Sequence, residues 1–63
     1  MTQNELVLKH IERYGSINPR TALERYSIFR LAARINELRE AVQIETKLVK
    51  TPTGKHYARY SLA

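Results

Sequence analysis

The sequence contains no cysteine and no aspartate, and it has only two glycines and two prolines. Without cysteine, neither a disulfide nor a thiolate metal site can stabilise the chain. That absence fits a reducing compartment, and we expect the protein to act in the cytoplasm. No apolar run approaches the roughly 18 residues of a membrane-spanning helix, and the N-terminus lacks the apolar core of a signal peptide. We therefore expect no membrane partner.

Acidic groups are outnumbered more than two to one by basic groups in the second half of the chain. The 63 residues, enough for one domain over 1–63 with one small core, carry a net charge of +5. Residues 27–63 hold seven basic side chains against three acidic ones, whereas residues 1–26 hold four against three. Because a cationic domain attracts polyanions, chiefly nucleic acid and less often anionic lipid, we expect the binding surface in residues 27–63.

Two short helices are predicted in the first half. Thr2 and Glu5 can form a capping box at the start of the first helix, and Gly15 is suited to end it. Asn18 followed by Pro19 marks the start of the second helix. The side chains expected to be buried are Leu6, Val7, Ile11 and Tyr14 in the first helix and Ala22, Leu23 and Tyr26 in the second.

A third helix is predicted over residues 28–41, with Ser27 able to cap it. At about 100° per residue, its apolar side chains form one narrow stripe. The stripe consists of Ile28, Leu31, Ile35, Leu38 and Val42. The far side carries Phe29, Arg30, Ala33, Asn36, Glu37 and Glu40, with Arg34 on its flank.

From residue 44 the apolar period changes to two, which predicts a β-hairpin over 44–62. Residues Pro52–Gly54 suit a three-residue loop with the glycine in a left-handed conformation, which sets Thr51 opposite Lys55. One face then pairs Ile44 with Leu62, Thr46 with Tyr60 and Leu48 with Ala58, and the other pairs Glu45 with Ser61, Lys47 with Arg59 and Val49 with Tyr57. A shift by one residue would mix apolar and polar faces, so hydrophobic matching selects this register.

The predicted order of elements, with room for a short third strand at 16–17, is that of a winged helix-turn-helix. This is an α+β fold, mainly helical, in which three helices precede a hairpin called the wing. Four segments repeat a pattern of known proteins: Thr21-Ala-Leu23, Ile28-Phe-Arg-Leu-Ala-Ala-Arg-Ile35, Leu38-Arg39 and Tyr60-Ser-Leu62. With them, the stretch from Pro19 to Leu62 resembles small helix-turn-helix proteins of bacteriophages and prophages. The resemblance implies sequence-dependent binding of double-stranded DNA by the third helix.

The exposed side of the third helix supplies candidates for reading bases. Arg30 and Arg34 lie one turn apart, and arginine donates two parallel hydrogen bonds to guanine O6 and N7 in the major groove. Ala33 lies between them, and its small side chain leaves room for the helix surface to approach the bases. Further contacts offered by this side are a thymine methyl for Phe29, an adenine for Asn36 and a cytosine amino group for Glu37.

Three of these candidates also have an ordinary structural interpretation. Arg34 can form a surface ion pair with Glu37, worth at most a few tenths of a kcal/mol, or brace the second helix. Phe29 can pack on Tyr26 or on the hairpin, and this packing is the favoured interpretation of that residue. Glu37 can simply discourage contact with phosphates.

Candidates for contact with the DNA backbone are concentrated on the hairpin. Lys47 and Arg59 are directly opposed there, which destabilises a sheet unless a polyanion lies beside it. The full set of backbone candidates is Arg20, Thr21, Ser27, Lys47, Lys50, Lys55, His56 and Arg59. The alternative is a solubilising face that also protects a sheet edge from pairing.

Nothing in the sequence favours catalysis, a metal or a cofactor. The two histidines, His10 and His56, fall on separate elements, and zinc requires three or four ligands. The sequence thus predicts a non-enzymatic DNA-binding protein, a transcriptional regulator or recombination accessory factor of a phage or mobile element. Since one small domain offers few base contacts, a homodimer or side-by-side copies on DNA are expected. The alternatives are a winged-helix protein-interaction module, such as an inhibitor or anti-repressor, and a non-specific single-strand or RNA binder.

Overall fold

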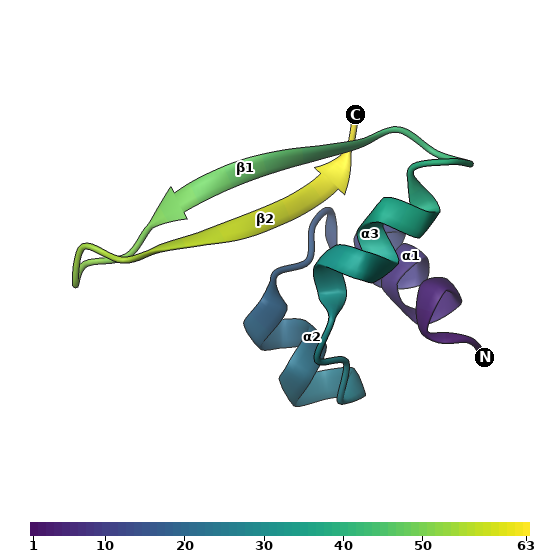
Figure 1. Cartoon of the computed structure of the whole chain (residues 1–63), viewed down its shortest axis with the longest axis horizontal. Coiled ribbons are helices and arrows are strands. Elements are labelled where there is room, and N and C mark those ends of the chain that lie inside the picture. Colours follow the sequence, from purple (N-terminus) through teal and green to yellow (C-terminus); the bar gives the residue numbers. More distant parts are fainter.

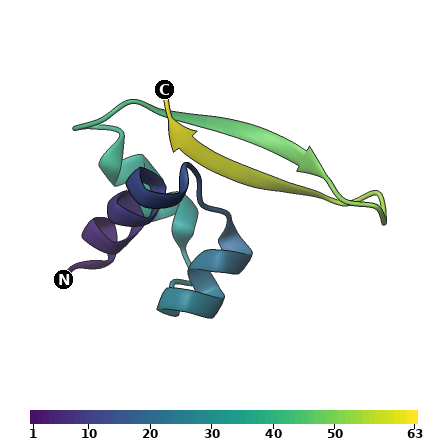
Figure 2. The same cartoon turned by 180° about the vertical axis from the view of Figure 1, so that it is seen from behind.

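The computed structural model describes residues 1–63 and contains three helices followed by a two-stranded antiparallel hairpin. The elements are α1 (Gln3–Tyr14), α2 (Pro19–Tyr26), α3 (Leu31–Leu38), β1 (Ile44–Lys50) and β2 (His56–Leu62). Figures 1 and 2 show the helices gathered at one end of the hairpin, whose turn projects well beyond them. The predicted winged helix-turn-helix architecture is confirmed. No helix has the length and apolar character that crossing a membrane requires.

The ends of α1 and the start of α2 are set by local signals, as predicted. The Glu5 N–H donates to Thr2 Oγ1 at 3.2 Å and the Thr2 N–H donates back to Glu5 Oε1 at 3.3 Å, which completes the capping box. Gly15 ends α1 in a left-handed conformation with φ 91°. At the start of α2, the Thr21 N–H donates to Asn18 Oδ1 at 2.8 Å, and Pro19 occupies the first turn.

The third helix is shorter than predicted: it spans Leu31–Leu38 instead of 28–41. Ser27 does not cap it. It ends α2 instead, in a left-handed conformation with φ 55° and ψ 35°. The Ile28 N–H donates back to the Ala22 carbonyl, so this segment belongs to the end of α2. After Leu38 the chain continues in turns, and the Ala41 N–H donates to the Leu38 carbonyl three residues back.

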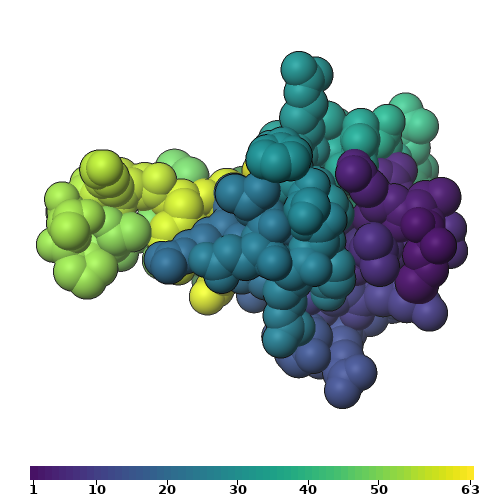
Figure 3. Space-filling model, turned by 90° about the horizontal axis from the view of Figure 1, so that it is seen from below, coloured from purple at the N-terminus to yellow at the C-terminus, as the bar shows by residue number.

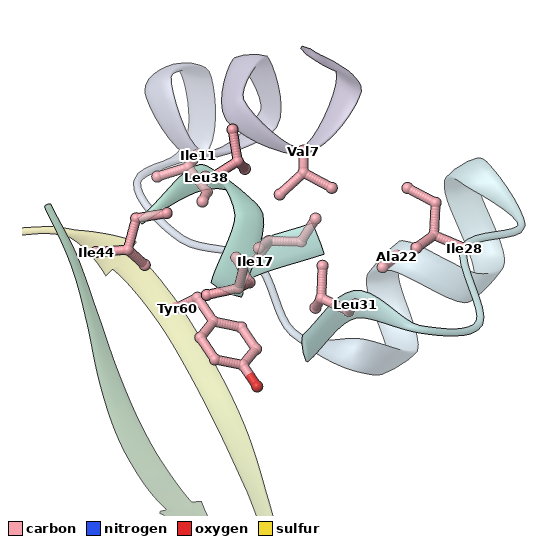
Figure 4. Close-up of a cluster of buried hydrophobic side chains, with 10 residues drawn as sticks. Val7, Ile11, Ile17, Ala22, Ile28, Leu31, Leu38, Ile44 and Tyr60 are labelled. Atoms are coloured by element: carbon pink, nitrogen blue, oxygen red, sulfur yellow. The ribbon is translucent and has the colours of Figure 1, made fainter. Parts of the chain in front are cut away.

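Ten buried apolar side chains from every element form the core (Figure 4). They are Val7, Ile11, Ile17, Ala22, Ile28, Leu31, Ile35, Leu38, Ile44 and Tyr60. Of the side chains expected to be buried in α1 and α2, Tyr14 is 53% exposed and Leu23 is 44% exposed, while Leu6 and Tyr26 are only half-buried. The core thus reaches only part of each predicted stripe.

The predicted hairpin register is confirmed at every pair from Ile44–Leu62 to Val49–Tyr57. The loop closes as expected, because the Thr51 N–H donates to the Lys55 carbonyl at 2.7 Å and Gly54 adopts φ 85°. However, Leu48 on the inner face is 73% exposed. Only the root of the hairpin lies on the helices, so its distal half has no core to cover.

Two contacts fix the root of the hairpin. Ile17 pairs with Tyr60 through reciprocal backbone hydrogen bonds of 2.9 and 2.8 Å, a single bridge where a short third strand was expected. Arg39 forms the second contact: its Nε donates to the Ile44 carbonyl at 3.3 Å and its Nη2 donates to Thr46 Oγ1. Its Nη1 also donates to Asn36 Oδ1 at 3.4 Å. Arg39 therefore ties the end of α3 to β1.

The core covers Ile35 but not Leu48, so truncating each of these side chains to alanine tests how far the core extends. We expect Ile35→Ala to lower the free energy of unfolding by about 2–5 kcal/mol, because the side chain is fully buried. Leu48→Ala should change it by less than about 0.5 kcal/mol, since Leu48 lies in water. Urea denaturation followed by circular dichroism measures both. A cost at Leu48 comparable to that at Ile35 would mean that the distal hairpin is packed.

Candidate nucleic-acid interface

Arg30 precedes the first turn of α3 and is the unpaired cation of this region. It is exposed, with φ −115° and ψ 62°, and its side chain makes neither an ion pair nor a hydrogen bond within the protein. Ala33, one turn along, is half-buried. The guanidinium is consequently available to an external acceptor, on the end of the helix that approaches base edges in helix-turn-helix docking.

Arg34 is held against the protein. Its Nε lies 2.7 Å from Glu37 Oε1, and its Nη1 donates to Gln3 Oε1 at 3.1 Å. The ion pair expected as an alternative is thus present. The suggested brace to the second helix is wrong, because Arg34 contacts α1 instead. Such a surface ion pair contributes about 0.2–1 kcal/mol to stability, so a DNA contact can replace it. Without DNA, Arg34 and Glu37 are paired with each other.

Phe29 was expected to pack on Tyr26 or on the hairpin. It does not, and the residue is 84% exposed. Phe29 follows the left-handed turn at Ser27 that ends α2, in the loop ahead of α3. Ser27 itself is exposed in this turn. Phe29 and Arg30 therefore stand together on the surface ahead of α3.

The cations of the hairpin have no acidic partners. Lys47 and Arg59 are directly opposed, and Lys50 is opposed to His56 near the turn. All four are exposed, as is Lys55, and the ion pairs of the protein lie elsewhere, at Arg20–Glu24 and Arg34–Glu37. This concentration of unpaired positive charge is unfavourable in isolation and is relieved by a polyanion.

A groove separates the start of α2 from the hairpin turn. It has a volume of about 450 Å³, and Arg20, Lys55 and His56 are among its lining residues, with Asn18, Pro19, Thr51 and Tyr57. Figure 3 shows the hairpin projecting beside the blue segment at the start of α2. Thr21 lies just behind, half-buried, with its N–H already bonded to Asn18. The groove brings one backbone candidate of α2 together with two of the hairpin.

A second hollow of about 390 Å³ adjoins the start of α3. It is lined by Arg30, the first turn of α3, Phe29, Tyr60 and Pro19. Pro19 borders this hollow and also the groove beside the hairpin turn. The start of α3, the start of α2 and the hairpin turn therefore form one continuous surface, which combines the unpaired Arg30 with the cations Arg20 and Lys55.

A comparison with protein families matches residues 2–63 to the model described as "Winged helix-turn-helix domain". The chain belongs to the winged helix-turn-helix family. Searches of curated proteins and of solved structures found no significant match. A winged helix-turn-helix domain is suited to DNA binding in general, and such domains are typically non-enzymatic.

Two features of this winged helix-turn-helix domain were not predicted from the sequence. Tyr60 was predicted only as an inner-face partner of Thr46, yet it also lines the hollow at α3. The second is Arg39, whose contacts to the hairpin depend on an approach of α3 and β1 that no sequence pattern specifies. The aromatic residue in Tyr60-Ser-Leu62 is the only signal that marks the first feature.

His10 is a buried packing residue. The structure contains no group of three or more side chains that could hold a metal ion. His10 is 6% exposed, and its Nδ1 lies 2.8 Å from the Tyr26 hydroxyl. Its ring centroid lies 4.6 Å from that of Tyr14, with the two rings tilted by 41°, and the Arg25 guanidinium lies 5.1 Å from the Tyr14 ring centroid. Burial, with a smaller effect of Arg25, lowers the pKa of His10 below its ordinary value of 6.5.

The lowered pKa of His10 predicts a pH-dependent stability. Below pH 6.5 the unfolded chain binds a proton that the folded His10 resists, so the free energy of unfolding is highest above 6.5. We expect it to decrease as the pH falls through 6.5 toward the lower pKa of the folded state. In His10→Gln this component should be missing. Urea denaturation from about pH 7.5 to about pH 5 tests it, and an equal pH dependence in both proteins would contradict it.

Proposed function

We propose that this winged helix-turn-helix protein binds double-stranded DNA in a sequence-dependent manner. In this proposal, α3 enters the major groove and the hairpin wing contacts the backbone or the minor groove. The observation that carries it is the surface joined at Pro19, on which the unpaired Arg30 shares a face with the cationic groove of α2 and the wing. Such a surface matches an arrangement in which backbone contacts position the protein and base contacts specify the sequence.

Arg30 is the principal base reader in this proposal. Its guanidinium has no partner to give up, whereas Arg34 must first leave Glu37 and Gln3. A bidentate contact with guanine contributes about 1–3 kcal/mol of discrimination against other bases. Phe29, exposed beside Arg30, is suited to a thymine methyl, and Ala33 allows the close approach that both contacts require.

The wing and the start of α2 supply the backbone contacts. Lys47, Lys50, Lys55, His56 and Arg59 are the wing residues assigned to phosphates or to the minor groove, with Arg20, Thr21 and Ser27 on the helical side. Lys55 and Arg20 line one groove, so a strand passing between α2 and the wing would meet both. Arg20 is bonded to Glu24 at 2.8 Å, but the pair is highly exposed and easily exchanged for a phosphate.

The biological role we infer is that of a phage or mobile-element transcriptional regulator or recombination accessory factor acting in the cytoplasm. A domain with so few base-reading side chains gains specificity from a homodimer or from side-by-side copies on DNA.

One observation favours a second candidate function. Phe29 is 84% exposed, and an exposed aromatic is a common anchor of protein interfaces. A winged-helix inhibitor or anti-repressor would bind a protein through it or through the hairpin. Counterion release makes DNA binding fall steeply with salt, so association that is independent of salt would favour this alternative.

Replacement of Arg30 tests the proposal most directly. We expect the parent protein to select a motif from a random duplex pool, and Arg30→Ala to lose the preference at one or two positions of that motif. Arg34→Ala is the matched control, with a smaller expected loss because its guanidinium is held by Glu37 and Gln3.

Lys55→Ala separates backbone contact from base reading. It should weaken binding to all sequences alike and reduce the slope of log K against log salt by about one unit. If Arg30→Ala and Lys55→Ala both bind the selected duplex as the parent does, the docking arrangement is wrong.

A further inference from the structure

The hydroxyl group of Tyr60 has no function in the fold. Tyr60 is only 8% exposed, and its ring belongs to the core. The hydroxyl makes no hydrogen bond within the protein. Every fully enclosed polar side-chain atom of the protein does have a partner, so this hydroxyl is not fully enclosed. It must therefore reach the surface, and Figure 4 shows its oxygen pointing away from the apolar cluster. The place that it reaches is the hollow at the start of α3.

The same hollow exposes unpaired backbone donors. Helical pairing in α3 starts with the Arg34 N–H, which donates to the Arg30 carbonyl at 3.3 Å. The N–H groups of Leu31, Ala32 and Ala33 have no acceptor in the protein, because Arg30 at the cap position offers no side-chain bond. Free N–H groups and the positive end of a helix favour an anion. The Tyr60 hydroxyl, at the end of a residue that is only 8% exposed, adds a further donor to the same hollow.

We propose that this hollow binds one phosphate of the DNA backbone. The Tyr60 hydroxyl donates to one phosphate oxygen, and the free N–H groups of the first turn of α3 donate to the others. The inference rests on the proposed DNA binding and specifies one contact within it. A phosphate held there fixes how far α3 enters the major groove, and it leaves Arg30 at the rim for base edges.

The walls of the hollow favour a phosphodiester over free phosphate. Apart from Arg30 and Tyr60, the lining residues are Pro19, Phe29, Leu31, Ala32 and Ala33. Apolar walls give nothing to an inorganic ion, whereas a backbone phosphate carries a deoxyribose on each side that can lie against them. The volume of about 390 Å³ holds roughly a dozen waters at about 30 Å³ each, which is ample for a phosphate with part of its sugars.

Tyr60→Phe tests the site with little effect on the core, because the ring remains. Its melting temperature should match that of the parent. Its affinity should fall about tenfold for the selected duplex and for unrelated duplexes alike, since a hydrogen bond to a charged group is lost. Tyr14→Phe removes a hydroxyl from α1 outside the hollow and should leave the affinity unchanged.

Neutral phosphates locate the contact on the DNA. In a series of duplexes that each carry one methylphosphonate, the substitution at one position should weaken DNA binding by the parent protein about tenfold. The same substitution should not weaken binding by Tyr60→Phe any further. The proposal is overturned if Tyr60→Phe binds like the parent, or if every methylphosphonate affects both proteins equally. If only the hollow is wrong, Arg30→Ala and Lys55→Ala still alter binding. If the parent binds no duplex, the proposed function fails as well.

Titration with inorganic phosphate distinguishes the two sources of the anion. The amide signals of Ala32 and Ala33 should shift strongly with duplex and weakly with millimolar phosphate, in the parent more than in Tyr60→Phe. Strong shifts with inorganic phosphate, together with no Tyr60-dependent position in the methylphosphonate series, would assign the hollow to a free anion and overturn the DNA assignment.

Discussion

The pairing of Ile17 with Tyr60 is the contact on which the arrangement of this domain depends. Two backbone hydrogen bonds of 2.9 and 2.8 Å join the segment between α1 and α2 to the wing, and both side chains enter the core. Because only the root of the hairpin is held in this way, its turn projects past the start of α2 and creates the cationic groove (Figure 1). The same pairing brings the Tyr60 hydroxyl to the start of α3.

The protein has a net charge of +5, but only some of its basic side chains are free to contact a partner. Several helical cations are engaged within the protein: Arg20 with Glu24, Arg34 with Glu37, Arg39 with the hairpin and Arg25 with Tyr14. The wing cations and Arg30 are not engaged, although nothing in the composition separates the two groups. Lysine is concentrated on the wing, where no glutamate faces it across the strands. Two of the unengaged cations, Arg30 and Lys55, line the hollow and the groove that share Pro19, which is why we assign that surface to DNA.

Sequence reasoning predicted the elements that local chemistry determines. The capping box at Thr2 and the hairpin register both follow from short-range patterns and are confirmed. The ends of α3 were wrong, because a helical wheel cannot reveal that Ser27 takes a left-handed conformation and ends α2. Ile28 is buried as its periodicity suggested, but from a turn instead of a helix. The contacts of Arg39 and the orientation of the Tyr60 hydroxyl depend on tertiary packing, which no single segment encodes.

The central claim is that the surface from the start of α3 to the wing turn is the one that meets DNA. Mapping of backbone amide shifts during titration of the isotope-labelled protein with a selected duplex tests it most directly. The account predicts the largest shifts at Arg30–Ala33, at Asn18–Arg20 and around Lys55, with little change along the outer side of α1 from Lys9 to Arg13. Shifts concentrated on α1, with none at the start of α3 or on the wing, would contradict it.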